Sequence, residues 1–228
     1  MDIRFNQIID LTLPITTGMS VPPGNRKNQP PVEYKKIRTH EDSGIQVGFF
    51  STGIHAGTHL DAPLHTEAGK PCITELPLDY FIAPAYCIDC SEVKANEPVT
   101  AEMLEKAADE IRPGMHVYLY TGWTEKYFGK TDDYWSEAPY LGEDAAWWLV
   151  RHGAKIACYD FFQEIAAKNP HFDAADFHVH HILLGNGCLN MEHATNLSKV
   201  VGKHFTSVAF PIKIEGAEGA ATRAIALL

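Results

Sequence analysis

Apolar residues fall into short runs bounded by Gly, Pro, Asn and Asp at many places along the chain, and such runs predict β-strands. Pro14 ends the first of these runs, and the third run leads directly into a histidine-rich segment. We therefore predict strands over residues 7–13, 32–38, 45–52, 86–89, 117–120, 156–159, 205–214 and 224–228.

Three segments carry helix signals. Thr100 is suited to cap a helix over residues 100–111, with Pro113 and Gly114 beyond its end. A second helix is predicted over residues 145–151, before Gly153, and a third over residues 174–184, ending near Gly185. We predict loops over residues 134–139 and over residues 18–31, where Gly and Pro are frequent and a functional lid is expected.

These helices and strands mix without strict βαβ alternation, and no internal repeat or linker interrupts them. A chain of 228 residues is long enough for one full hydrophobic core. The simplest interpretation is one α/β domain over residues 1–228.

The charge and the thiols exclude some classes of function. A formal net charge of -10 disfavours a nucleic-acid-binding surface, and no apolar segment is long enough to predict a membrane span. Cys87 and Cys90 form a C-x-x-C pair, but no second Cys pair or nearby His completes a zinc site. Buried, reduced thiols are expected, which fits a cytoplasmic protein, and a redox protein using this pair is the alternative.

Four potential metal ligands lie between His55 and His65. His55, His59, Asp61 and His65 are mostly imidazoles with one carboxylate, a mixture that suits zinc, manganese or iron better than calcium or magnesium. A straight strand separates positions 55 and 59 by roughly 13 Å, too far for two ligands of one ion. Because Gly57 lets the backbone curl, we predict a curved strand-to-loop segment around a metal.

A second group of donors follows late in the chain and is expected to complete the site. His178, His180 and His181 form a cluster, and Glu192 follows. Periodicity does not decide which of these His residues takes part. Asp176 lies one turn before His180 and is the expected partner carboxylate of that imidazole. We expect His178 to be exposed, and we expect the two later histidines, His193 and His204, to be ordinary surface residues.

The segment 55–65 matches the pattern H-x-G-T-H-x-D-x-P-x-H, and so the chain resembles the cyclase-like metal-dependent hydrolases. That family includes bacterial kynurenine formamidase and isatin hydrolase. The resemblance extends over nearly the whole chain, through Asp10 to Ile15, Tyr120 to Trp123, Ala145 to Leu149, and Pro211 to Gly216 with Arg223.

The resemblance implies a fold and a role for each matching residue. The implied fold is the swivelling β/β/α type, with a mixed sheet and flanking helices, usually in a homodimer or homotetramer. His65 matches the general acid/base. The implied ligands of one or two divalent ions, zinc or manganese, are His55, His59, Asp61, His180 and Glu192.

Two segments depart from the family pattern and indicate where substrate choice resides. Relatives often carry a D-x-x-S-x-D-like stretch after the central strand, whereas this chain has Asp160-Phe161-Phe162-Gln163-Glu164. The loop 18–31 contains Val21-Pro22-Pro23-Gly24, where many relatives have an aromatic residue before Pro-Gly. Phe161, Phe162 and Trp123 are therefore the predicted substrate-binding aromatics, although core packing explains most aromatic residues of the chain.

The predicted function is hydrolysis of a small amide or lactam by metal-activated water. Two alternatives remain open from the sequence. One is a hydrolase of lactones or other cyclic esters with the same fold, and the other is a non-catalytic metal-binding protein. The predicted partner is a small-molecule substrate, with no nucleic acid and no membrane.

Overall fold

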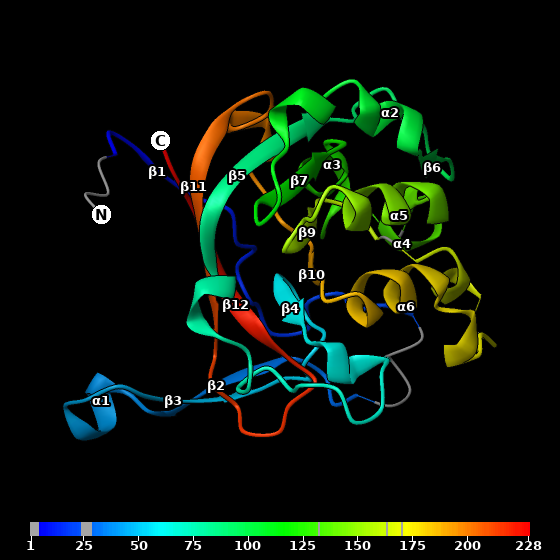
Figure 1. Ribbon diagram of the computed structural model, residues 1–228. Helices are drawn as coiled ribbons and strands as arrows, with labels where there is room; N and C mark the ends of the chain where they lie inside the picture. Colours follow the sequence, from blue (N-terminus) through cyan, green and yellow to red (C-terminus); the bar gives the residue numbers. More distant parts are fainter. Residues whose placement is uncertain (1–4, 24–28, 132, 163, 170) are drawn as a thin grey trace.

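A computed structural model describes residues 5–23, 29–131, 133–162, 164–169 and 171–228. The main sheet has the strand order β1-β12-β11-β5-β7-β9-β10-β4 (Figure 1). Four neighbours, β5, β7, β9 and β10, are parallel, and the strands on either side are antiparallel. The strands are β1 Ile8–Asp10, β4 His59–Asp61, β5 Ile82–Asp89, β7 His116–Tyr120, β9 Ile156–Tyr159, β10 Leu189–Glu192, β11 His204–Pro211 and β12 Gly219–Leu227.

Helices cover the outer face of the parallel strands, on the side of the sheet away from β11 and β12 (Figure 1). Leu104, Leu149 and Leu183 carry this packing, because each is buried among outward-facing residues such as Val117 and Leu119 of β7. The described helices are α1 His40–Ser43, α2 Ala101–Glu105, α3 Trp123–Tyr127, α4 Asp133–Ser136, α5 Glu143–Arg151 and α6 His178–Gly185, of which α1 lies away from the sheet.

The sheet closes on itself, because β12 pairs with β4 as well as with β11 and β1. Side chains alternate across each strand, so Tyr118 of β7 points inside while Val117 and Leu119 point toward the helices. The interior is filled by an apolar cluster that includes Leu60, Tyr118, Ile156 and Met191. A closed sheet therefore places the short strand β4 against two neighbours at once.

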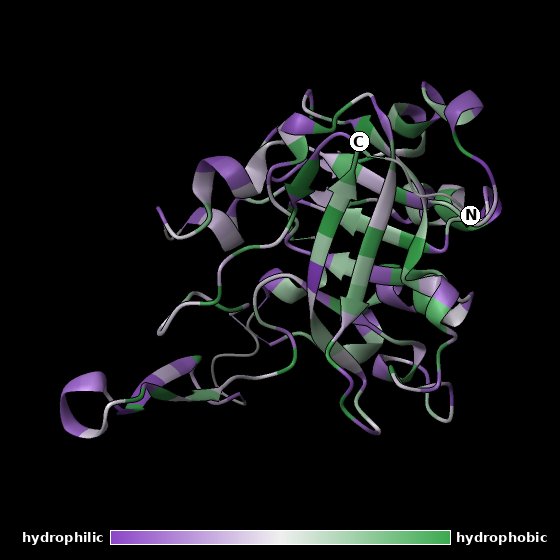
Figure 2. Ribbon diagram, turned by 90° about the vertical axis from the view of Figure 1, so that its left-hand side faces the viewer, coloured by the Kyte–Doolittle hydropathy of each residue, from purple (hydrophilic) through white to green (hydrophobic). Residues whose placement is uncertain are grey.

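A hairpin of β2 Glu33–Arg38 and β3 Val47–Ser51 projects from the body and carries α1 at its tip (Figures 1 and 2). Both strands are mostly exposed, including Ile37 and Phe49. A further two-stranded pairing joins β6 Pro98–Val99 to β8 Tyr140–Leu141. The β2–β3 arm is largely exposed, although the Thr17 side chain bonds the backbone of Tyr34 in β2. An isolated two-stranded hairpin is marginally stable in water.

The predicted α/β class, with a mixed sheet and flanking helices, is confirmed. Every predicted strand has a counterpart, although β5 and β12 extend well beyond the predicted bounds. Thr100 caps α2 by accepting a hydrogen bond from the backbone N–H of Met103 at 3.4 Å. The helix predicted over 100–111 was too long, since α2 ends at Glu105 and a 3-10 turn, Ala108–Glu110, follows.

Two other predictions of local structure were wrong in part. The loop predicted over 134–139 begins as the helix α4, in which Tyr134 and Trp135 are buried. The helix predicted over 174–184 is divided at Phe177 into a 3-10 turn, Ala174–Asp176, and α6. Residues 24–28 of the predicted lid, and Gln163, lie outside the described residues.

The five cysteines are free and buried. Burial raises the pKa of the Cys90 thiol, and also that of the Cys87 thiol, which disfavours reactive thiolates. Among the described residues, no helix combines the length and apolar character that a membrane crossing needs.

Candidate metal centre

The segment from Gly57 to His65 curves as predicted. Gly57 has a φ of 63°, in the left-handed region that glycine adopts without strain. β4 carries His59 and Asp61, and Pro63 starts a 3-10 turn that ends at His65. His59 Nδ1 lies 2.8 Å from the Gly57 carbonyl, an acceptor, so Nδ1 carries the proton and Nε2 presents its lone pair to the site.

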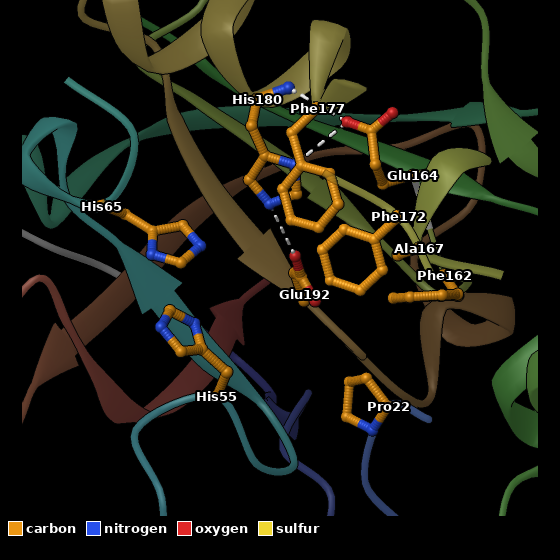
Figure 3. A pocket seen from close by; sticks show the side chains of 10 residues that line it. All are labelled: Pro22, His55, His65, Phe162, Glu164, Ala167, Phe172, Phe177, His180 and Glu192. Carbon is orange, nitrogen blue, oxygen red and sulfur yellow. Dashed lines mark hydrogen bonds and ion pairs between the residues drawn. The ribbon is translucent and has the colours of Figure 1, made fainter. Parts of the chain in front are cut away.

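The second donor group joins this segment through strand pairing. In the antiparallel register of β10 with β4, Glu192 lies opposite His59. The helix α6 places His180 beside both carboxylates, and Figure 3 shows its ring directed toward Glu192. The structure thus brings together the six residues predicted for metal binding and proton transfer, namely His55, His59, Asp61, His65, His180 and Glu192.

The distances between donor atoms are those of ligands around a common ion. His59 Nε2 lies 3.5 Å from Asp61 Oδ1 and 3.8 Å from Glu192 Oε2. His180 Nε2 lies 3.8 Å from Asp61 Oδ2 and 3.5 Å from Glu192 Oε1. Two ligands bound at about 2.1 Å in tetrahedral geometry are about 3.4 Å apart, so little rearrangement is needed.

Several of these donor atoms are buried and form no hydrogen bond of good geometry with the described residues. They are both oxygens of Asp61 and the Nε2 atoms of His55 and His59. Asp61 Oδ1 lies 2.9 Å from His55 Nδ1, and His55 Nε2 lies 3.4 Å from Glu218 Oε1, as ion-pair contacts. Unpaired buried polar atoms are costly, and a cation is the group that satisfies carboxylate and imidazole lone pairs together. Two sets can hold a metal, His55–Asp61–His65 and His59–Asp61–Glu192, and Asp61 belongs to both. The residues present therefore fit one or two divalent ions.

Electrostatics at the centre favour positive charge. Burial lowers the pKa of His55, but the Asp61 carboxylate outweighs this effect and raises it to about 10. The same balance holds at His180, where burial is outweighed by Glu164 and Glu192 and the pKa rises to about 10. Two buried carboxylates therefore hold protons on nearby imidazoles, and a divalent cation is the alternative source of that charge.

His65 has the opposite character. Its ring centre lies 4.1 Å from that of His55 and 5.5 Å from that of His180. Burial lowers its pKa to about 4, against the attraction of Asp61 and with the repulsion of the other two imidazoles. His65 is therefore neutral at pH 7, and one of its ring nitrogens carries a lone pair.

Sequence reasoning chose the wrong partner for His180. Glu164 Oε2 lies 3.1 Å from His180 Nδ1, and this contact appears in Figure 3. Asp176 instead forms a capping box with Asp173 at the surface, because the chain breaks helical geometry at Phe177. Glu164 lies in the segment that departs from the family pattern, and this position was the one sign in the sequence that Glu164 has a role at the site.

The sequence led us to expect His193 at the surface, and this prediction was wrong. His193 is 1% exposed, and its Nε2 lies 3.4 Å from Glu192 Oε2. The sequence did offer a sign of its burial, since His193 directly follows the predicted ligand Glu192 at the end of a buried strand. His178 and His204 are exposed, as expected.

A pocket opens beside the centre and has one aromatic wall (Figure 3). Phe162, Phe172 and Phe177 form this wall, and Pro22 from the predicted lid approaches it. Phe172 stacks on Phe177 with ring centres 4.8 Å apart, and Phe177 stacks on His180 at 4.9 Å. A flat substrate group entering here meets ring faces on one side and the donor cluster on the other.

Two of the predicted substrate-binding aromatics lie elsewhere. Phe161 is fully buried in the core, in contact with Tyr159, because alternate side chains after β9 point in opposite directions. Trp123 is buried beside Tyr127 and donates to the Tyr134 carbonyl at 3.0 Å. Neither lines the pocket, and Phe162 is the one of the three that does.

The chain is similar to proteins of one family over its whole length. A kynurenine formamidase from Salinibacter ruber is 28% identical over 225 residues, which cover 96% of each chain. An isatin hydrolase from Roseibium aggregatum is 30% identical over 237 residues, which cover 94% of this chain and 88% of that protein. A solved isatin hydrolase bound to the product analogue thioisatinate superposes with a TM-score of 0.84, at 25% identity over 97% of this chain and 92% of that one.

A further solved relative is described as a potential metal-dependent hydrolase with cyclase activity, with a TM-score of 0.71 and 24% identity over 96% of each chain. The sequence model of one family, Cyclase, described as "Putative cyclase", matches residues 9–163. That match covers more than half of the chain, and it includes the whole segment from His55 to His65. The chain therefore belongs to the cyclase family of hydrolases.

Proposed function

We propose that the protein is a metal-dependent hydrolase that cleaves a carbon–nitrogen bond in a small amide or lactam. The observation that carries the proposal is the cluster of buried imidazole and carboxylate donor atoms centred on Asp61, directly beside an aromatic-walled pocket. The full-length relatives named kynurenine formamidase and isatin hydrolase support the same chemistry. Zinc or manganese suits the mixture of imidazole and carboxylate donors.

Each residue of the centre has a defined task in this proposal. A divalent metal held by His55, His59, Asp61, His180 and Glu192 supplies Lewis-acid chemistry and favours the ionisation of water at neutral pH. Glu164 holds the ring of His180 through Nδ1, so that Nε2 faces the carboxylates. The aromatic wall excludes water from one side of the substrate and orients a flat group against the donors.

His65 moves the proton in the proposed reaction. It lines the pocket, its ring centre lies 4.1 Å from that of His55, and it is neutral at pH 7. Neutral Nδ1 or Nε2 accepts the proton of the attacking water and then donates it to the leaving nitrogen. His65 also belongs to the His55–Asp61–His65 set, and this membership supports the alternative role of a metal ligand.

The decisive experiment is an assay of the metal-loaded protein with N-formylkynurenine, isatin and simple lactones in parallel. Turnover of an amide or lactam that disappears with a chelator and returns with zinc or manganese is the expected result. Turnover of lactones alone favours the cyclic-ester hydrolase, since sequence and geometry treat the two carbonyls alike. Tight metal binding without turnover of any carbonyl substrate favours the non-catalytic alternative.

We further propose a homo-oligomer, a homodimer or homotetramer, acting in the cytoplasm. The β2–β3 arm supports self-association, because it exposes six large apolar side chains and little of it is buried. They are Tyr34, Ile37, Ile45, Val47, Phe49 and Phe50. Among the described strands, β2 and β3 pair with each other alone, and natural proteins usually cover the edges of such a pair. Sedimentation equilibrium tests this point, and a monomer at micromolar concentration contradicts it.

A further inference from the structure

The buried imidazole of His193 is not explained by the roles proposed above. It follows Glu192 at the end of β10 and has a φ of 56°, a left-handed conformation that few residues other than glycine adopt. Thr58 Oγ1 donates to the His193 carbonyl at 2.7 Å and holds this backbone in place. Such conformations cost about 1–3 kcal/mol and persist where the surroundings determine them.

The hydrogen bonds around Tyr134 are compatible with a proton on Nδ1 of His193. The Thr124 hydroxyl donates to the Asp160 carbonyl at 2.6 Å. The Tyr134 hydroxyl lies 3.1 Å from Thr124 Oγ1 and can donate to it, while its oxygen accepts from His193 Nδ1 at 2.7 Å. In this tautomer His193 Nε2 carries a lone pair.

That lone pair faces a carboxylate. His193 Nε2 lies 3.4 Å from Glu192 Oε2 and has no hydrogen-bond partner among the described residues. Two facing lone pairs repel each other, and a cation between them removes the repulsion. The separation is also the one expected for two donors on one tetrahedral ion at about 2.1 Å.

Aromatic rings pack around the imidazole of His193. Trp135 packs against the His193 ring edge to face at 5.2 Å, and Phe162 lies parallel to it at 6.4 Å. The ring centre of His59 is 6.1 Å away. Two imidazoles bound to one tetrahedral ion at about 2.1 Å have ring centres about 5.2 Å apart, so a shift of about 1 Å brings His59 and His193 to the same ion.

We propose that His193 is an additional metal ligand, which binds through Nε2 on the side of the centre where Glu192 Oε2 and His59 meet. The inference rests on the metal site of the proposed function and is independent of the substrate. It extends the donor set by one residue beyond the family motif. Tyr134 and Thr124 act behind it by holding the ligating tautomer.

The test is metal affinity in matched variants. His193→Asn removes Nε2, keeps a donor toward Tyr134, and tolerates the positive φ, since Asn adopts this conformation readily. We expect zinc affinity, measured by competition with a chelator, to fall about 10-fold or more, and the visible spectrum of the cobalt-loaded protein to change. Tyr134→Phe, which frees the tautomer, is expected to weaken binding by a smaller factor. His178→Asn, at an exposed imidazole, is the matched control and should behave like the unmodified chain.

Unchanged affinity and an unchanged cobalt spectrum in His193→Asn would overturn the inference. If the unmodified chain itself binds no metal, the proposed function fails instead, so the two failures are distinguishable. If His193→Asn does not fold, ¹⁵N NMR of the ring nitrogens in the unmodified protein decides the question. A His193 Nε2 signal that stays at its metal-free position after zinc is added contradicts the proposal.

Discussion

The acid sensitivity of the fold can be predicted from one buried histidine. His116 begins β7 and points inside the closed sheet, on the same face as Tyr118. Its Nε2 donates to the Tyr80 carbonyl at 2.7 Å, and its Nδ1 accepts from the Ser207 hydroxyl at 2.8 Å. Ser207 Oγ in turn accepts from the Tyr118 hydroxyl at 2.8 Å. This network joins β7 to β11 and requires neutral His116.

The size of the effect follows from the pKa. Burial lowers the pKa of His116 from 6.5 to about 4, with a smaller contribution from the charge of Lys155 and an opposing one from the Tyr80 hydrogen bond. As pH falls below 6.5, the unfolded chain binds a proton at this residue and the folded chain does not until about pH 4. Stability is therefore full above pH 6.5 and decreases down to about pH 4, by about 3 kcal/mol at about 1.4 kcal/mol per pKa unit.

Urea unfolding of the unmodified chain and of His116→Gln, at pH 7.5, 5.5 and 4.2, measures this contribution. Other groups titrate in both proteins, so the difference between the two free energies of unfolding isolates His116. Gln retains a donor near the position of Nε2, and the variant should be less stable at pH 7.5. The difference should shrink by about 3 kcal/mol as the pH falls to 4.2. A difference that stays constant with pH would refute the reasoning.

Three further predictions concern the site. His59→Ala should lose most of its bound metal by elemental analysis, because His59 Nε2 faces both Asp61 and Glu192, and unchanged metal content would contradict its assignment as a ligand. His65→Gln should keep its metal but lose about 10²–10⁴-fold in kcat, the usual contribution of a proton-transfer group, whereas full turnover would exclude that role and loss of metal would make it a ligand. Phe172→Ala should raise KM for aromatic substrates about 2–10-fold, from a ring contact of about 0.5–1.5 kcal/mol, and leave KM for aliphatic formamides unchanged.

Local features of the sequence predicted the segment around His59 well. The spacing of donors, the freedom of Gly57 and the turn at Pro63 are all encoded within eleven residues. The helix cap at Thr100 and the strand β9 are similarly local, since a side chain or an apolar run determines each one.

Features that depend on contacts between distant segments were predicted poorly. Glu164 and Asp176 are both acidic residues that precede His180 in the sequence. The break in the helix at Phe177 turns Asp176 away, so that Glu164 is the carboxylate that contacts His180. His193 has no sequence periodicity that reveals its burial, because its surroundings come from Trp135 and Phe162. Phe161 and Phe162 are chemically alike, and the direction of the chain after β9 alone sends one to the core and the other to the pocket.

The donor cluster lies at the seam where the sheet closes, and this position links the metal to the fold. β4 is three residues long, yet it pairs with β10 through His59 opposite Glu192 and with β12 through Asp61 opposite Gly219. Without a metal, the imidazoles of His55 and His180 supply positive charge to the two buried carboxylates at this seam, and a divalent cation would supply it in their place. A metal at 100 times its Kd stabilises the folded chain by about 2.7 kcal/mol. Metal binding is therefore expected to stabilise the closure of the sheet, and residues that order β4 contribute both to this closure and to the donor cluster.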